Sequence, residues 1–142
     1  MRQMTDEEWI AFLRQGTRTA KLSINLPSGR PTVTPVWFLY GDDNTVRIET
    51  GAASAKTRAL AADPRACLVV DLEEAPYAFV KIDSIATIVD DPELTLRVAT
   101  DIGRRYMGET LADEYGKRNG GPGQVTIEFT PIRVTAVHDI SD

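Results

Sequence analysis

The chain has 142 residues, of which 42% are hydrophobic and 26% charged, a composition typical of a globular domain. The formal net charge of −5 disfavours nucleic acid as a partner. No apolar run approaches the roughly 20 residues that span a bilayer, and MRQMTDEEW lacks the apolar core of a signal peptide. One cysteine, Cys67, and one histidine, His138, exclude a disulfide framework and a multi-Cys or His-rich metal site. We therefore expect a cytoplasmic protein with no metal, membrane segment or nucleic-acid partner.

Three helices are expected from capping residues and apolar spacing. Thr5 and Glu8 have the spacing of a capping box ahead of apolar residues at helical intervals. Ser54 can cap a short Ala-rich helix, and Asp91 followed by Pro92 marks the start of a longer one. The helices are expected at residues 6–15, 55–62 and 92–106.

Alternation of apolar and polar residues predicts about six or seven strands. Pro35 within a strand indicates a sheet edge or a bulge, and a phase slip near Ser84 indicates another bulge. Residues 116–123 are expected to form a glycine-rich loop, and Pro131 is expected to break the alternating segment that follows. The predicted strands cover residues 20–26, 32–40, 45–50, 65–72, 77–89, 125–129 and 133–139.

Most of these strands follow one another with turn residues between them, which favours antiparallel hairpins over β-α-β repeats. We therefore expect a mainly β fold, an antiparallel barrel with flanking helices, built as a single domain over residues 1–142. No G-x-S-x-G motif supports a serine nucleophile. If the protein is an enzyme, a bound cofactor is expected to carry the difficult chemistry.

The segment from Gly51 to Arg58 is the first candidate binding site. Free backbone N–H groups at the start of a helix bind anions, and Lys56 and Arg58 add positive charge there. Small residues over 51–55 let a phosphate approach the backbone, although the segment lacks the glycine that precedes the lysine of a Walker A loop. The alternative is a solvated helix start with two ordinary surface cations.

The segment from Thr32 to Phe38 is the second candidate. Pro35 exposes strand backbone and Trp37 offers a flat surface, so a planar heteroaromatic ligand could lie there. The alternative is that Trp37 and Phe38 pack in the core.

A group of cations in an acidic chain is the third feature. These residues could attract an anionic ligand, or they could stabilise helix C-termini through the helix dipole. His138 and Cys67 are interpreted as structural residues. The cations are Arg104, Arg105, Lys117 and Arg118.

The chain contains, in order, a strand with TVTPVWF, a turn, a further strand, SAKTR and DPRACLVV. This order resembles the pyridoxamine 5′-phosphate oxidase-like superfamily of split β-barrel flavin and deazaflavin oxidoreductases. It is most similar to the small branch that binds the deazaflavin coenzyme F420. The resemblance extends over residues 5–138, and residues 54–71 carry its most specific part, with Ala59 where the family commonly has Asn.

The resemblance implies an FMN-binding split-barrel fold that forms a homodimer with cofactor sites at the interface. It implies that Lys56 holds the cofactor phosphate with the help of Arg58, and that residues near Trp37 line the ring system. It implies no metal ligand, and it leaves the catalytic residues unknown. The cofactor-binding residues that it indicates are Pro35, Val36, Trp37, Thr50, Gly51, Ser54, Lys56 and Arg58.

The expected function is hydride transfer from reduced F420 to an electron-poor small organic substrate. An FMN-dependent oxidoreductase of the same fold is the alternative, because both cofactors are tricyclic and carry a phosphate. F420 also carries an oligoglutamate tail, which the four cations described above would favour. A further alternative is a non-catalytic cofactor-binding or haem-handling protein, in which His138 would be the only available imidazole.

Overall fold

An antiparallel sheet of eight strands is the framework of the protein, and the computed structural model describes it over residues 1–142. The strands are β1 (Arg2–Gln3), β2 (Ala20–Asn25), β3 (Pro31–Val36), β4 (Leu39–Tyr40), β5 (Val46–Gly51), β6 (Arg65–Leu72), β7 (Ala78–Val89) and β8 (Gln124–His138). The helices are α1 (Asp6–Arg14), α2 (Ala55–Ala62), α3 (Pro92–Met107), the 3₁₀ segment η1 (Glu109–Leu111) and α4 (Ala112–Asn119).

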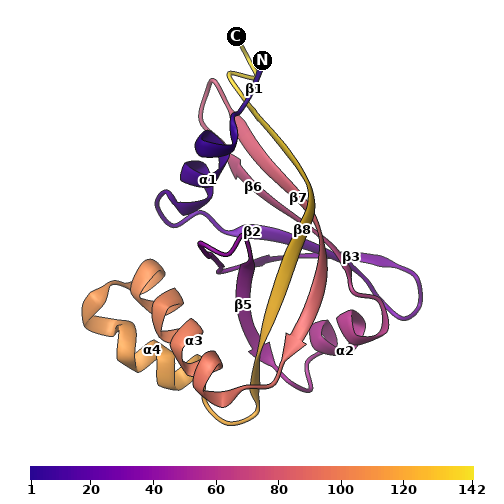
Figure 1. Cartoon of the computed structure of the whole chain (residues 1–142), viewed down its shortest axis with the longest axis vertical. Coiled ribbons are helices and arrows are strands. Elements are labelled where there is room, and N and C mark those ends of the chain that lie inside the picture. The colour runs from indigo at the N-terminus through magenta and orange to yellow at the C-terminus, as the bar shows by residue number, and fades with distance from the viewer.

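The order of the strands requires the sheet to curl. The order is β3-β2-β6-β7-β8-β5-β4, with β1 paired to β8. β3 and β4 stand at opposite ends of this order, yet only Trp37 and Phe38 separate them in the chain. The two ends of the sheet are therefore brought together, and Figure 1 shows the resulting curled half-barrel with helices on its flanks. The predicted fold class is confirmed.

The core lies on the concave side of the curled sheet, where alternate strand residues point inward. Leu22, Leu68, Val80 and Ile127 are each almost completely buried there. Helix α1 covers the end of the sheet near the two chain termini, and α2 lies toward the opposite end (Figure 1). Helix α3 packs outside the sheet, against β5 and β8, and α4 packs on α3.

The helices begin where their capping residues predict. Thr5 Oγ1 accepts a hydrogen bond from the Glu8 backbone at 3.2 Å, and the Glu8 carboxylate accepts one from the Thr5 backbone at 2.8 Å. Ser54 caps α2 and Asp91 caps α3, which has Pro92 in its first turn. None of the helices combines the length and the apolar character needed to span a membrane.

The predicted strand over residues 32–40 is divided into β3 and β4 by the corner at Trp37 and Phe38. β3 pairs only with β2, so Pro35 lies on an edge strand, as predicted. The sequence could not show the corner because both residues have high strand propensity.

The predicted break at Pro131 is wrong, because β8 continues through it. The strand register shifts between Asp83 and Ser84 of β7, where Arg133 and Pro131 are the successive partners and Ile132 is an extra residue. This bulge confirms the phase slip predicted near Ser84. Proline is tolerated at a bulge because the ladder hydrogen bonds are already interrupted there.

The predicted glycine-rich loop over residues 116–123 is also partly wrong, because α4 extends to Asn119. A Cβ atom at Gly116 would lie 3.0 Å from the Cα of Thr100, and one at Gly120 would lie 2.7 Å from the Cβ of Ala99. These glycines therefore allow α4 to pack closely on α3. A run of glycines commonly indicates a loop, but here Gly116 and Gly120 are required by helix packing.

Candidate functional site

The two predicted halves of the binding site lie on either side of the short β4–β5 pair: one ends at the corner before β4, and the other begins at the end of β5. β4 pairs with β5 only through Leu39 and Tyr40, so the rest of the β5 edge has no strand partner on that side. Phe38, which directly precedes β4, and Ile48 on β5 are both almost fully buried. Trp37 lies at the corner between β3 and β4 and is partly buried.

The connection from β5 to α2 is an ordered turn held by hydroxyl groups. Ser54 Oγ accepts a hydrogen bond from the backbone of Thr57 at 3.2 Å and lies 3.4 Å from Thr50 Oγ1. The Thr57 hydroxyl donates to the Gly51 carbonyl at 2.7 Å. The Ala52 backbone donates to the carbonyl of Gly123 at 2.8 Å, which ties this turn to the loop after α4. The structure therefore brings Thr50, Gly51 and Ser54 together.

Three backbone N–H groups in this turn make no hydrogen bond within the chain, those of Ala53, Ala55 and Lys56. They lie at the N-terminal end of α2, where the helix dipole favours negative charge. No acidic side chain occupies the first turn of α2. This arrangement can accept an anion such as a phosphate.

Lys56 is partly buried and lies in the electrostatic field of Glu49 on β5. Burial lowers the pKa of Lys56, and the Glu49 carboxylate partly opposes this effect. Burial raises the pKa of Glu49 to about 7, which the Lys56 ammonium partly offsets. Arg58 is exposed and donates to the Ala53 carbonyl at 2.6 Å. The sequence analysis does not single out Glu49. Its alternation with the inward-facing Ile48 predicts an outward-facing carboxylate in the strand that leads to Gly51.

Trp37 has aromatic neighbours from α3 and α4. Its ring stacks on Tyr106 with centroids 5.0 Å apart and an interplanar angle of 3°, and it lies 6.1 Å from the ring of Tyr115. The Tyr106 hydroxyl accepts from the Phe38 backbone at 3.3 Å and donates to the Arg18 carbonyl at 2.8 Å. One face of the Trp37 ring is therefore covered by Tyr106, which holds the ring in its orientation. Pro35 is exposed and Val36 partly buried beside it.

The four cations singled out in the sequence differ in their availability. Arg105 donates to the carbonyls of Leu13, Gly16 and Phe38 at 2.8–3.0 Å, so its guanidinium is structural. Arg104 forms surface ion pairs with the carboxylates of Asp101 and Glu109. The remaining two cations are exposed on α4.

One of these, Lys117, lines a cavity of about 650 Å³ beside the predicted anion site. Ala52 forms part of the wall, together with the loop Gly120–Gln124 and residues at the start of α3. Arg118 instead lies over the ring of Tyr115 at 5.1 Å. Lys117 is therefore the cation best placed to extend the anion site.

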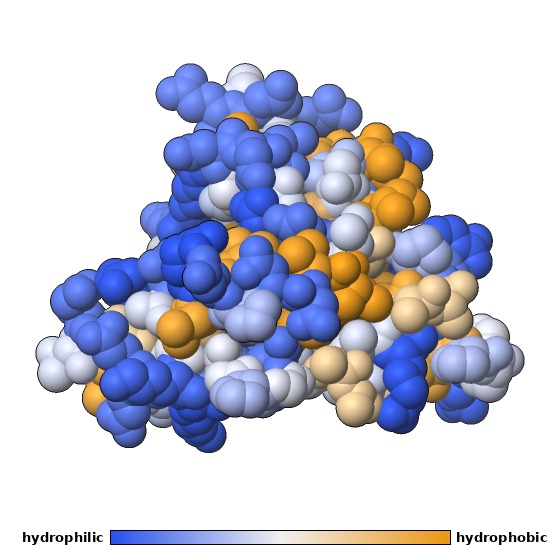
Figure 2. All heavy atoms as spheres, turned by 60° about the horizontal axis from the view of Figure 1, so that its bottom comes forward, coloured by the Kyte–Doolittle hydropathy of each residue, from blue (hydrophilic) through white to orange (hydrophobic).

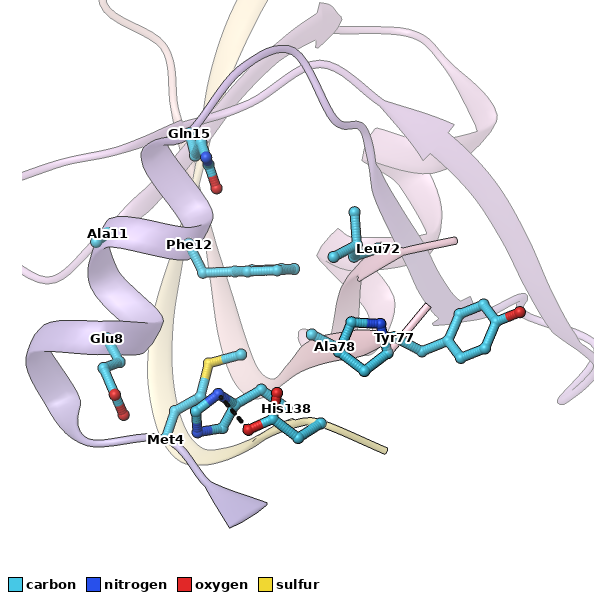
Figure 3. A pocket seen from close by; sticks show the side chains of 11 residues that line it. Met4, Glu8, Ala11, Phe12, Gln15, Leu72, Tyr77, Ala78 and His138 are labelled. Atoms are coloured by element: carbon cyan, nitrogen blue, oxygen red, sulfur yellow. Dashed lines mark ion pairs between the residues drawn. The ribbon is translucent and has the colours of Figure 1, made fainter. Parts of the chain in front are cut away.

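A second cavity, of about 640 Å³, lies under α1 and was not foreseen from the sequence. Figure 3 shows Phe12 projecting into it from α1, opposite Leu72, with His138 and Met4 below. His138 Nδ1 lies 3.3 Å from the Arg2 guanidinium and 3.5 Å from the Asp139 carboxylate, while its Nε2 is enclosed without a hydrogen-bond partner. The cavity contains none of the predicted site residues.

Apolar side chains also reach the surface of the sheet. Val33 and Ile132 are 62% and 67% exposed, and Tyr77 is also exposed. Figure 2 shows apolar atoms gathered across the middle of one face, with hydrophilic residues around them. Phe38 is 1% exposed and packs in the core, as the alternative for the second candidate segment expects.

Comparison with known proteins identifies the family. The family described as pyridoxamine 5′-phosphate oxidase matches residues 5–138, so the chain belongs to this family. The resemblance found in the sequence is thereby confirmed. No curated protein matches the chain.

Solved structures with the same fold include proteins with different described roles. A conserved hypothetical protein from Mycobacterium tuberculosis is 23% identical with a TM-score of 0.85, covering 99% of this chain and 92% of its own. An F420 reductase is 22% identical with a TM-score of 0.72, covering 87% and 94%. The haem storage protein HutZ from Vibrio cholerae is 20% identical with a TM-score of 0.72, covering 98% and 100%. At these identities the likeness establishes the fold.

Proposed function

We propose that this protein is a cytoplasmic oxidoreductase that uses coenzyme F420 to transfer a hydride to an electron-poor small organic substrate. The observation that carries the proposal is the β5–α2 turn, where three unpaired backbone N–H groups and the partly buried Lys56 form a candidate anion site. The family match and the structural likeness to an F420 reductase support it. FMN is the alternative cofactor, because the same turn would hold its phosphate.

The residues present fit such a cofactor. Lys56 and the free amides of the turn would hold the phosphate, with Thr50, Gly51 and Ser54 beside it and Arg58 at the exposed rim. Charge-assisted hydrogen bonds of this kind are about twice as strong as neutral ones. The partly buried position of Lys56 strengthens its attraction for an anion because water screens it less.

The ring system would lie against Pro35, Val36 and Trp37. Stacking on Tyr106 fixes the orientation of Trp37 before any ligand arrives, so that little side-chain entropy is lost on binding. When bound, the cofactor supplies hydride transfer. The protein's part is to position the ring and to exclude water from it.

We further propose that two copies of the chain associate through the apolar outer surface of the sheet, with the cofactor sites at the interface. The support is the exposure of Val33 on β3 and Ile132 on β8, which a monomer would leave in water. Edge strand β3 also has an unpaired side.

The test is to titrate the protein, freed of cofactor, with F420 and with FMN. We expect F420 to bind more tightly, and Lys56→Ala to weaken that binding by about tenfold to a hundredfold. Arg30→Ala, which removes a cation from the exposed turn between β2 and β3, is the control and should leave affinity unchanged.

Three results would contradict the proposal. Tight FMN binding without F420 binding would replace the cofactor, and unchanged affinity in Lys56→Ala would remove the anion site. A Soret band in the purified protein would favour the haem-handling alternative. The contacts of His138 speak against that alternative, because Arg2 and Asp139 engage Nδ1 and Nε2 is enclosed.

A further inference from the structure

The cavity of about 640 Å³ under α1 has a size and a lining that suit a small organic molecule. Ligand cavities in proteins are commonly about 300–1,000 Å³ and are lined mainly by apolar side chains with a few polar groups. Here α1 forms one wall, and the end of β6, the turn into β7 and the end of β8 form the other. Figure 3 shows Phe12 and Leu72 facing each other across this space.

The spacing of residues along α1 explains why the cavity stays open. Trp9 and Leu13, one turn apart, are the buried residues that fix α1 on the sheet. Glu8 and Phe12 are also one turn apart, but they lie on a neighbouring face of the helix and line the cavity. Phe12 and Leu72 are each only partly buried, so both walls keep apolar surface that a ligand can cover.

One end of the cavity carries more negative than positive charge. Glu8 and Asp139 belong to its lining, and their side chains are 40% and 39% exposed. Both carboxylates meet the same guanidinium, since Arg2 lies 3.5 Å from Glu8 and 3.9 Å from Asp139. With His138 neutral, as in the formal charge at pH 7, one cation shared between two anions leaves an excess of one negative charge.

The charged groups around the cavity do not reverse this sign. Glu73 and Glu74 are exposed in the turn that forms the opposite wall, and they add negative charge. Arg18 does not line the cavity, because its guanidinium lies over the Phe12 ring at 4.0 Å and donates to the Phe12 carbonyl at 2.8 Å. The carboxylate of Asp71 also acts on Arg18 and opposes its charge. The cavity therefore favours a cation over an anion.

We propose that the cavity under α1 binds a small organic cation, which consists of an ammonium group attached to an apolar body. The ammonium lies beside Glu8 and Asp139, and the apolar body lies between Phe12 and Leu72. This inference goes beyond the proposed function, since the cavity shares no residue with the β5–α2 turn. An apolar anion of the same size fits the walls equally well, but the carboxylates repel it.

The experiment compares two ligands with the same apolar body, 4-phenylbutylamine and 4-phenylbutyrate. Each is titrated into the whole protein at pH 8 and followed by NMR, because at this pH the amine is a cation and the acid an anion. For ligands of this size, we expect the amine to bind with a Kd of about 1 mM or below. We expect the acid to bind about tenfold more weakly, because an attraction becomes a repulsion.

A double variant, Glu8→Gln with Asp139→Asn, removes both carboxylates and should bring the two affinities to within about threefold. The substitutions keep the local structure, because glutamine also completes a capping box and asparagine tolerates the φ of 52° at Asp139. The matched control, Asp113→Asn with Glu114→Gln, removes the same number of charges from exposed positions on α4. It should leave the tenfold difference unchanged.

Ala11→Trp tests the location of the ligand, because this exposed residue of α1 lines the cavity and an indole would fill part of it. We expect both ligands to bind at least about tenfold more weakly to this variant, since their apolar contacts are lost. Unchanged affinities in Ala11→Trp would overturn the inference, as would equal binding of the two ligands, or of neither, by the unmodified protein. A tenfold preference that persists without Glu8 and Asp139 would overturn it as well.

Discussion

Arg105 gives a direct test of how the region around the candidate site is held together. Its guanidinium donates to the carbonyls of Leu13, Gly16 and Phe38, which belong to the end of α1, the turn after it and the corner between β3 and β4. Arg105→Ala removes three charge-assisted hydrogen bonds and the contact with the Phe38 ring at 4.7 Å. At about 1–1.5 kcal/mol each, after allowing for water that reaches the vacated site, the loss is about 3–5 kcal/mol.

For a domain of this size, that loss corresponds to a decrease in Tm of about 10–15 °C. The assay is thermal unfolding followed by circular dichroism. Arg104→Ala is the matched control, because the neighbouring arginine makes only surface ion pairs with Asp101 and Glu109. We expect its Tm to stay close to that of the unmodified protein. Equal melting temperatures for the two variants would refute the structural role of Arg105.

Three further predictions follow from particular residues. Because burial raises the pKa of Glu49 to about 7, the folded state retains a proton that the unfolded chain releases, and stability falls as the pH rises from about 4.5 to 7. In urea unfolding at pH 8, Glu49→Gln should therefore be about 1–2 kcal/mol more stable than the unmodified protein. Below about pH 4.5 the two proteins should have the same stability. A stability difference that does not change with pH would contradict this. Gly116→Ala should cost about 1–3 kcal/mol in the same assay, because its Cβ would press on the Thr100 backbone, and an unchanged midpoint would show that α4 can shift freely. Light scattering should give twice the mass of the chain. Val33→Glu should shift the measured mass toward that of the monomer. A monomeric unmodified protein would contradict the proposed interface.

The features that the sequence predicts well are determined by neighbouring residues. The capping box of Thr5 and Glu8, the cap of α2 at Ser54 and the alternation in β2 each depend on contacts within a few positions. A short local signal is enough for such features because the same few residues supply both the pattern and the interaction. The turn that forms the candidate anion site belongs to this class.

The features that it predicts poorly depend on distant partners. The local pattern predicts Gly116 in a loop because it carries no information about the packing of α4 on Thr100. Arg105 and Arg104 are adjacent and chemically identical, yet one binds three carbonyls and the other two carboxylates. Glu49 is a third example. Burial raises its pKa, and this burial comes from elements far away in the chain, such as β8.

The place of β8 in the chain decides when the candidate site can exist during folding. β5 has its one extended partner in β8, where Val46 pairs with Phe129 and Gly51 with Gln124. β8 follows every other strand in the chain, so the support for the turn after Gly51 arrives last during synthesis. Closing such a long loop is entropically costly and slow. The candidate anion site therefore forms late, and a partly synthesised chain that lacks β8 leaves the β5–α2 turn without its support.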